Sequence, residues 1–474
     1  MSNPEISGLP RVVHRRHLLA QFLLLPLLVV TCIAAILEPE LASVIPAGVV
    51  LVGSLLLSWK RLAPLWQSPA LIFAVVMTPT ALFGFTFGNQ LADLGGTGGA
   101  NTTLSGGDQV ATLWLFVAAQ LLVLACAAAT AGSPARANFP SVAVTPRIVA
   151  GALTLAASVL ILSVAYRGIG WYLERPLRFS SELGNLESLL TISSIASCVL
   201  LGLVIASTES SFARFWAIVL VLSYSLMFFA MGSRNLALAP ILVFLGMVLS
   251  GRHRLRVYQL LVVGALVAVL WPIPLVLRNQ ASHGLFPYVT ALPSADLGSD
   301  LWLASINNVL SGFNIVGTTA FVRPQISASD MATSISLLGG SEAGWYEVAS
   351  RLRLNHYTPY GAIGEIANQG IWVAVVSFCV LGVIFGFVQR VGRKLSDSAG
   401  GQVYYLVPLG LSILLVLQAT QYNLRSEMRL LYYALGAAVI GLVVHATHSA
   451  LARRSEGRSV RLKSVLGETL DERG

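Results

Sequence analysis

The side chains best suited to chemistry gather within 15 residues in the last third of the chain. They are two arginines, one histidine, two tyrosines and one glutamate. A guanidinium group grips phosphate through a planar pair of hydrogen bonds, and a histidine near its ordinary pKa can take a proton from a hydroxyl at neutral pH. The combination indicates binding of a phosphorylated group beside a proton acceptor, either the histidine or the glutamate. The residues are Arg351, Arg353, His356, Tyr357, Tyr360 and Glu365.

A second candidate position is the run Gly232-Ser233-Arg234 between two apolar segments. A Gly-Ser turn presents Arg234 at the start of a helix, where unpaired backbone N–H groups also attract anions. Arg278 follows a later apolar segment. We therefore add Arg234 and Arg278 to the candidate phosphate-binding residues.

Composition places these residues in a membrane protein. Charged residues are 11% of the 474 residues, against about 25% in soluble domains, and hydrophobic residues reach 55%. A chain with so few charges cannot cover a water-exposed surface, so its solvent must be lipid. The same composition excludes a secreted disulfide scaffold, a disordered protein and a nucleic-acid-binding protein, although the net charge is +9.

Apolar runs of about the 20 residues that cross a bilayer recur along the chain. They predict an all-α, polytopic membrane protein with about twelve transmembrane helices and both termini in the cytoplasm. The predicted spans are 17–37, 43–59, 69–87, 109–131, 148–166, 188–206, 212–231, 235–250, 258–277, 370–388, 403–421 and 430–447.

The spans divide the chain into five parts. A cytoplasmic tail, 1–16, precedes the first nine helices in 17–277. A long extracytoplasmic loop, 278–369, separates these from the last three helices in 370–447, and a basic cytoplasmic tail, 448–474, follows. Loops of this length are usually functional. Within the loop, an apolar stripe predicts an amphipathic helix on the bundle or in the membrane interface. The stripe comprises Trp302, Ile306, Val309, Leu310 and Phe313.

The distribution of charge supports this orientation. Lys and Arg concentrate in cytoplasmic loops of membrane proteins, and the predicted inner segments hold 20 of the 30 basic residues but 7 of the 21 acidic residues. All ten outer cations are arginines. Two interpretations remain open for them: an outward-facing anion clamp, or ion pairs with glutamates close in sequence, namely Glu174, Glu182, Glu187, Glu347 and Glu427. The outer arginines are Arg167, Arg175, Arg178, Arg234, Arg278, Arg323, Arg351, Arg353, Arg425 and Arg429.

We expect neither a metal site nor ion-coupled transport. The cysteines lie inside apolar runs without CxxC spacing or a nearby histidine, which is typical of small buried hydrophobic residues. No predicted span carries an ionisable residue near its centre, where coupled transporters need one. Chemistry is therefore expected at the outer boundary. The cysteines are Cys32, Cys126, Cys198 and Cys379.

Three features together resemble a known family. They are the turn before Arg234, the long loop ending in His356-Tyr357, and the run from Gly364 to Gly370 that leads into a span. The chain resembles, over about residues 200–450, the O-antigen polymerase or oligosaccharide repeat-unit polymerase family, which is related to the O-antigen ligases and the wider C-type glycosyltransferases. Arg353 and Gly364 also match an Arg-to-Gly spacing found in outer loops of some members.

The resemblance implies a bacterial inner-membrane enzyme that joins oligosaccharide repeat units carried on undecaprenyl pyrophosphate, without metal or cofactor. A hydroxyl of the incoming unit would attack the sugar C1 of the growing chain, and the lipid pyrophosphate would leave. His356 or Glu365 would serve the acceptor. The implied partners are the lipid-linked oligosaccharide, membrane lipid, a chain-length regulator and a flippase. Arginines and tyrosines would bind pyrophosphate and sugar: Arg234, Arg278, Arg351, Arg353, Tyr357 and Tyr360.

Three alternatives stay open. A ligase of the same superfamily would transfer the finished polymer to a different acceptor. A polysaccharide-unit flippase would need a cation-lined central cavity, against which the uncharged spans and the long loop argue. A structural membrane scaffold would not require the outer arginines.

Overall fold

The computed structural model describes most of the chain and shows it to be helical. Within this part no strand is present, and two isolated bridges pair Arg175 with His283 and Arg353 with Pro359. The predicted all-α fold is confirmed, and the lengths and composition of the helices are those of a multi-pass membrane protein. The described residues are 28, 30–39, 43–62, 68–93, 102–132, 144–176, 185–250, 257–277, 280–294, 298, 302–303, 306–307, 310–355, 358–396 and 401–471.

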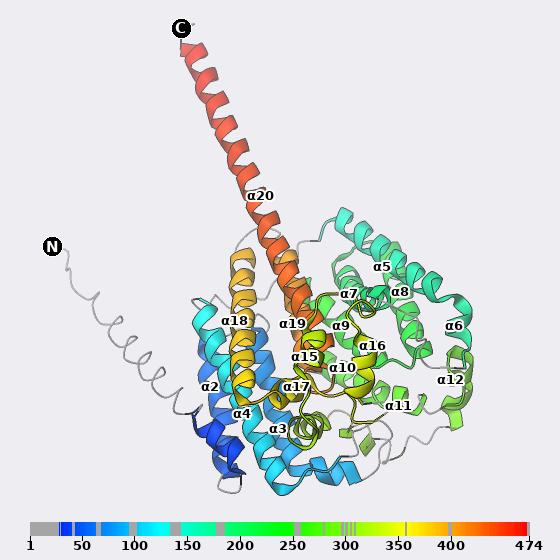
Figure 1. The fold of residues 1–474 in the computed structure, drawn as a ribbon. Coiled ribbons are helices and arrows are strands. Elements are labelled where there is room, and N and C mark those ends of the chain that lie inside the picture. Colours follow the sequence, from blue (N-terminus) through cyan, green and yellow to red (C-terminus); the bar gives the residue numbers. More distant parts are fainter. Residues whose placement is uncertain are drawn as a thin grey trace, which may run out of the picture.

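Figure 1 shows the helices in chain order. They are α2 (Val44–Leu62), α3 (Pro69–Asp93), α4 (Gly106–Thr130), α5 (Pro146–Arg167), α6 (Ile169–Leu173), α7 (Asn185–Ser207), α8 (Ser211–Ala230), α9 (Asn235–Leu249), α10 (Val257–Leu270), α11 (Ile273–Leu277), α12 (Leu285–Ala291), η3 (Leu292–Ser294), α14 (Gly312–Gly317), η4 (Thr318–Val322), α15 (Ala328–Ile335), α16 (Trp345–Arg351), α17 (Ala362–Asn368), α18 (Ile371–Ser396), α19 (Gly401–Gln418) and α20 (Leu424–Asp471).

Seven described helices are long and apolar enough to cross a membrane, and they coincide with seven predicted spans. Four further predicted spans correspond to shorter apolar helices: Val44–Trp59, Asn235–Leu249, Leu261–Leu270 and Val407–Gln418. The first predicted span, 17–37, lies mostly outside the described residues, although 30–37 are helical. The count of twelve therefore stays a prediction. The seven helices are Pro69–Ala92, Gly106–Thr130, Pro146–Arg167, Leu189–Ser207, Ser211–Ala230, Ile371–Leu395 and Leu424–Thr447.

Burial separates the helix at the centre of the protein from one that faces lipid. In α4, every residue from Ala111 to Leu124 is buried. The equally apolar α5 exposes Leu155, Ile161 and Leu162. A helix that is apolar on all sides must be enclosed either by protein or by lipid. We therefore assign α4 to the protein core and the outer face of α5 to the bilayer.

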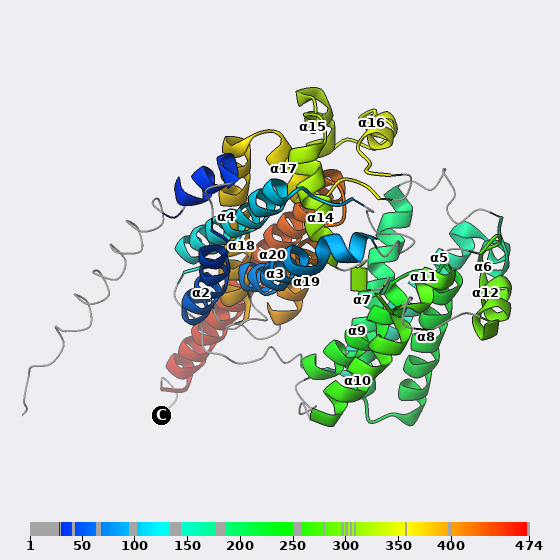
Figure 2. The same cartoon turned by 90° about the horizontal axis from the view of Figure 1, so that it is seen from below.

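The helices form two groups, each with its own core (Figure 2). In the first group, α2–α4, α14 and α17–α20 pack around large side chains such as Phe116 and Phe313. In the second, α5–α9, α11 and α12 pack around Tyr224 and Tyr288. Small residues permit the close approach typical of membrane helices: a Cβ on Gly382 of α18 would lie 2.6 Å from the Val123 carbonyl oxygen of α4.

Part of the long loop is inserted into the first group instead of lying on its surface. All residues of α14 are buried, because α3 has no side chain at Gly84, where a Cβ would collide with Phe313. The predicted apolar stripe is buried only in part. Phe313 is fully buried, whereas Trp302 and Ile306 are 37% and 45% exposed. Whether a side chain of this segment is buried depends on contact with α3, which periodicity within the loop does not reveal.

Hydrogen bonds join separate elements at both ends of the molecule. At one end, here called the Arg234 end, Arg234 contacts Gln421. At the other, the Gln389 side chain donates to the Leu62 carbonyl oxygen, and α20 continues beyond the bundle (Figure 1). The Arg234 end contains segments predicted to lie outside the cell, and the opposite end contains segments predicted to be cytoplasmic. The orientation itself stays a prediction.

Candidate functional site

The run that follows Tyr360 forms a short helix, α17. This helix packs between η4 and the 419–423 loop that joins α19 to α20. The Ala362 N–H donates to the Tyr422 carbonyl oxygen (2.8 Å). Glycines permit the contact, because a Cβ on Gly361 would lie 2.6 Å from the Thr420 carbonyl oxygen. This part of the predicted loop is therefore packed inside the Arg234 end.

Glu365 lies on α17 and has no exposed surface. Its Oε1 accepts a hydrogen bond from the N–H of Leu424, the first residue of α20 (3.1 Å). Its Oε2 has no hydrogen-bond partner. Burial raises the pKa of the carboxyl group from 4.5 to about 8, and the backbone hydrogen bond opposes this only in part. A group with this pKa can take up or release a proton slightly above neutral pH.

Tyr360 lies close to this carboxyl group, and Arg323 lies close to Tyr360. Tyr360 is buried, and burial raises its pKa, while the charge of Arg323 lowers it and that of Glu365 raises it further. Arg323 donates to the Leu354 carbonyl oxygen through Nη2 (2.9 Å), and its Nε has no partner. The sequence identified Arg323 as one of ten outer cations but did not select it for the site, because nothing local indicates its proximity to Tyr360.

Arg234 reaches the same region from the second helix group. The predicted turn is present: Gly232 has φ +58°, and Arg234 immediately precedes α9 without a side-chain cap. Its Nη1 donates to Gln421 Oε1 (3.2 Å). Gln421 is three residues before Leu424, the partner of Glu365. The 419–424 segment thus contacts both Arg234 and Glu365, and sequence spacing gave no sign of Gln421.

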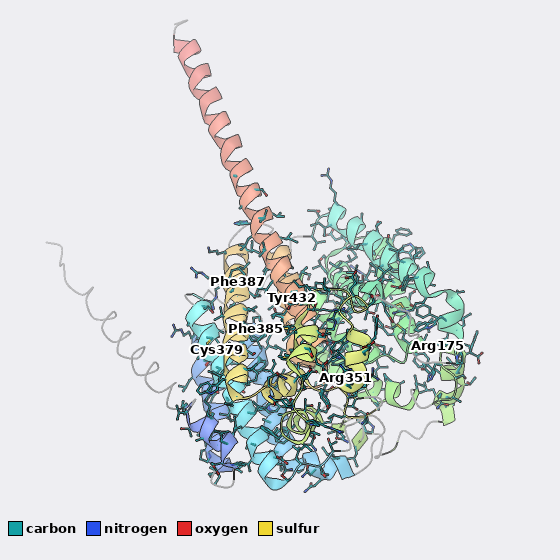
Figure 3. All side chains as sticks on the ribbon, in the orientation of Figure 1. Arg175, Arg351, Cys379, Phe385, Phe387 and Tyr432 are labelled. Atoms are coloured by element: carbon teal, nitrogen blue, oxygen red, sulfur yellow. The ribbon has the colours of Figure 1, made fainter. Side chains whose placement is uncertain are left out.

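Arg351 and Arg353 do not join this cluster through any hydrogen bond between described residues. Arg351 lies on α16 (Figure 3), and its Nη2 pairs with Asp330 Oδ1 at 2.7 Å while its side chain is 59% exposed. Arg353 is exposed and donates through Nε to the Ala349 carbonyl oxygen (2.9 Å). An ion pair therefore accounts for the position of the Arg351 side chain. Its partner is an aspartate and not one of the glutamates that the sequence predicted.

The run Pro359-Tyr360-Gly361 predicts a turn that would bring His356 and Glu365 to face one pocket. Instead, the Leu354 N–H donates to the Thr358 carbonyl oxygen (2.9 Å), and Arg353 pairs with Pro359. Residues 359–361 are therefore extended and lead into α17, so the predicted turn is wrong. Three predicted site residues, His356, Tyr357 and Arg278, lie outside the described residues.

Other outer arginines have structural partners. Arg167 pairs with Glu187 at 2.7 Å, as the ion-pair interpretation predicted. Arg425 donates to the carbonyl oxygens of Thr333 and Leu338 and lies over the Trp345 ring. The Arg425 contacts fasten the long loop to α20, and the Arg167 ion pair joins α5 to α7. A predicted outer location alone therefore does not identify a substrate-binding arginine.

Potential metal ligands are dispersed in the described part of the chain. In the part of the chain that the structure describes, no cluster of three His, Cys, Asp or Glu residues could hold a metal ion. Cys32 and Cys198 are buried, as predicted. Cys126 and Cys379 are partly exposed and lie close to each other across the α4–α18 contact, a proximity that their sequence separation concealed.

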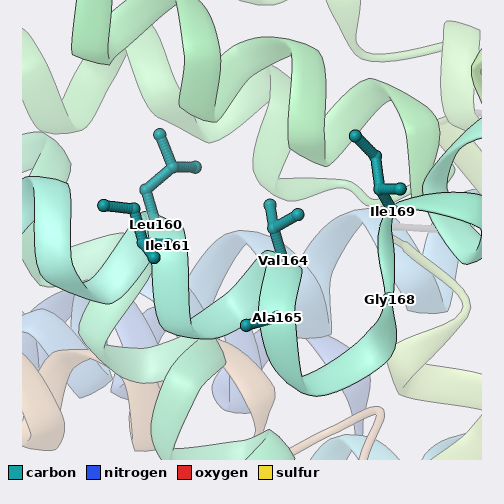
Figure 4. A pocket seen from close by; sticks show the side chains of 6 residues that line it. All are labelled: Leu160, Ile161, Val164, Ala165, Gly168 and Ile169. Carbon is teal, nitrogen blue, oxygen red and sulfur yellow. The ribbon is translucent and has the colours of Figure 1, made fainter.

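A hollow at the C-terminal end of α5 is lined by apolar side chains (Figure 4). It has no charged group that could hold a phosphate, and it lies on the face of α5 assigned to lipid. It is therefore suited to hydrocarbon and not to the chemistry of the candidate site. The lining residues are Leu160, Ile161, Val164, Ala165, Gly168 and Ile169.

Comparison with known proteins gave no match to a family model, a curated protein or a solved structure. The chemistry that the site can perform is therefore inferred from its own side chains. A half-buried guanidinium at Arg234 can bind an anion. A buried carboxyl at Glu365 can exchange a proton. Both contact one loop at one end of a membrane protein.

Proposed function

We propose that the chain is a polysaccharide polymerase of the bacterial cytoplasmic membrane. It would join lipid-pyrophosphate-linked oligosaccharide units at the outer face, in the manner of the O-antigen polymerases that the sequence resembles. The substrate would be an oligosaccharide on undecaprenyl pyrophosphate. A chain-length regulator and a flippase of the same pathway would be its partners.

One observation supports this proposal most strongly. Arg234 and Glu365 come from different helix groups, yet both hydrogen-bond to the 419–424 segment. A glycosyl transfer from a lipid pyrophosphate needs a cation for the leaving group and a proton acceptor for the attacking hydroxyl. The two groups meet these needs at the end of the molecule that charge distribution predicts to be outside.

In the proposed step, the oxygen of the acceptor hydroxyl forms a bond to the donor sugar C1. The bond between C1 and the pyrophosphate oxygen breaks, and the electron pair leaves with the lipid pyrophosphate. Arg234 would bind that departing anion. The hydroxyl proton would pass to Glu365 in its ionised form or to His356, and the two bases predict different pH dependences.

The direct test is turnover of a purified lipid-linked oligosaccharide by the purified protein in lipid nanodiscs. Arg234→Ala should abolish polymer formation at unchanged protein level. Arg234→Lys should restore it poorly, because a point charge does not replace a planar fork. Arg214→Ala is the matched control, since Arg214 donates to Thr208 O (2.8 Å) away from this site. A normal polymer ladder from Arg234→Ala would remove Arg234 from the site.

The same assay identifies the base. Glu365→Gln should lower turnover by about 10²–10⁴-fold if Glu365 accepts the proton, and the wild-type rate should then rise with pH up to about 8. A rise at about pH 6–7, with His356→Gln impaired instead, would assign the base to His356. Transfer only to a foreign acceptor would indicate a ligase, and lipid translocation without bond formation would indicate a flippase. Either result would overturn the polymerase proposal.

A further inference from the structure

Arg175, a buried outer cation, holds the end of helix α8. It is 4% exposed, and its Nη1 donates to the carbonyl oxygens of Trp171 (3.0 Å) and Ala230 (3.1 Å). Its guanidinium also stacks on the Trp171 ring, 3.9 Å from the centroid. Ala230 is the last residue of α8, so Arg175 restrains the chain just before the turn that carries Arg234. Figure 3 shows Arg175 beside α6, away from Arg351.

The backbone of Arg175 is joined to a second element that reaches the same turn. The Arg175 N–H donates to His283 O (2.7 Å), and the His283 N–H donates to Arg175 O (2.9 Å). The His283 ring nitrogen Nδ1 shares a hydrogen bond with the Tyr288 hydroxyl (2.9 Å). Both side chains are buried, with Tyr288 fully enclosed. The histidine thus fixes the orientation of the tyrosine.

The Tyr288 hydroxyl in turn lies directly against Gly232. A Cβ on Gly232 would be 3.0 Å from this oxygen, and Gly232 adopts φ +58°, which disfavours any other residue. Contacts therefore run from Arg175 through His283 and Tyr288 to Gly232, and directly from Arg175 to Ala230. The two contacts that reach the turn, at Ala230 and Gly232, lie four and two residues before Arg234. None of these three side chains reaches the 419–424 segment through a hydrogen bond between described residues.

We propose that Arg175, His283 and Tyr288 are positioning residues that hold the 230–234 turn so that Arg234 reaches Gln421 in the other helix group. The role of Arg234 in phosphate binding rests on the proposed function, whereas the position of Arg234 relative to Gln421 does not. A long, flexible arginine side chain binds well only if its backbone is fixed beforehand, because immobilising it on binding would otherwise cost entropy. The buried contacts described above provide that restraint.

The position of residue 234 relative to residue 421 can be measured without an activity assay. Cysteines replace Arg234 and Gln421 in a background in which the four native cysteines are changed to alanine or serine. A short bis-maleimide cross-linker then joins the two thiols through thioether bonds, and mass spectrometry follows the linked peptides. Adding Tyr288→Phe, which removes only the hydroxyl, should slow cross-linking by about 2- to 10-fold, the range that corresponds to one buried hydrogen bond. Arg175→Lys should slow it as well.

Tyr258→Phe is the matched control, because Tyr258 is exposed on α10, and it should leave the cross-linking rate unchanged. If Tyr288→Phe does not fold, His283→Gln tests the same contact with the tyrosine retained. Unchanged cross-linking in folded Tyr288→Phe and Arg175→Lys proteins would overturn the positioning role. Slower cross-linking in these variants, with normal polymer formation by Tyr288→Phe on the otherwise wild-type chain, would support positioning and contradict the proposed role of Arg234 in turnover.

Discussion

The buried carboxyl group of Glu365 should make the stability of the protein fall as pH rises. Its pKa is about 8 in the folded protein, against 4.5 for the free group. Between these values the folded chain binds the proton and the unfolded chain does not, so each rise in pH favours unfolding. The slope for this group is about 1.4 kcal/mol per pH unit, and its limit over the whole interval is about 5 kcal/mol.

Glu365→Gln removes the titration while keeping an oxygen that can accept from the Leu424 N–H. The amide brings two N–H donors to the place where Oε2 has no partner, and an unsatisfied buried donor costs about 1–3 kcal/mol. The variant should therefore be less stable than wild type at pH 5 and more stable at pH 9. The two curves should cross between these limits.

The assay is thermal unfolding of detergent-solubilised protein from pH 5 to 9. The difference between wild type and Glu365→Gln isolates Glu365 from all other titrating groups, including buried Glu427. Glu347→Gln is the matched control, because Glu347 is exposed, and its curve should run parallel to that of wild type. If the Glu365→Gln curve is also parallel to wild type throughout, the carboxyl group does not bind its proton more tightly in the folded protein, and the reasoning is refuted.

Three further predictions test the packing, the loop and the orientation. Gly364→Ala should destabilise the protein by about 1–3 kcal/mol, because its Cβ would lie 2.8 Å from the Val316 carbonyl oxygen, whereas Gly436→Ala meets nothing within 4 Å and should leave the melting temperature unchanged. Arg351→Ala should change stability by less than about 1 kcal/mol and leave polymer formation intact, since the Arg351 side chain is 59% exposed and pairs with Asp330. Loss of polymer at a normal melting temperature would show that Arg351 belongs to the site. Reporter fusions within 278–369 should indicate the outside, and fusions within 251–257 and 390–400 the cytoplasm; a cytoplasmic signal from 278–369 would contradict the proposed function.

Local sequence is enough to predict a helical membrane protein and the positions of most of its apolar helices. Hydropathy is a local property of a run of about 20 residues, so α4 and α5 were both predicted without knowledge of their neighbours. The turn before Arg234 was also predictable, because Gly232 supplies a backbone conformation that other residues rarely adopt.

Packing between distant segments determines which of these apolar and charged residues are buried and which residues they contact. The α4 core run and the exposed face of α5 have similar hydropathy but opposite surroundings. Phe313 is buried because α3 presents Gly84 to it, and Arg351 is occupied by Asp330, 21 residues away. The proximity of Arg234 to Gln421 joins residues 187 positions apart. The raised pKa of Glu365 likewise follows from desolvation by the segments that pack around α17. Because these segments are distant in sequence, local sequence does not predict the shift.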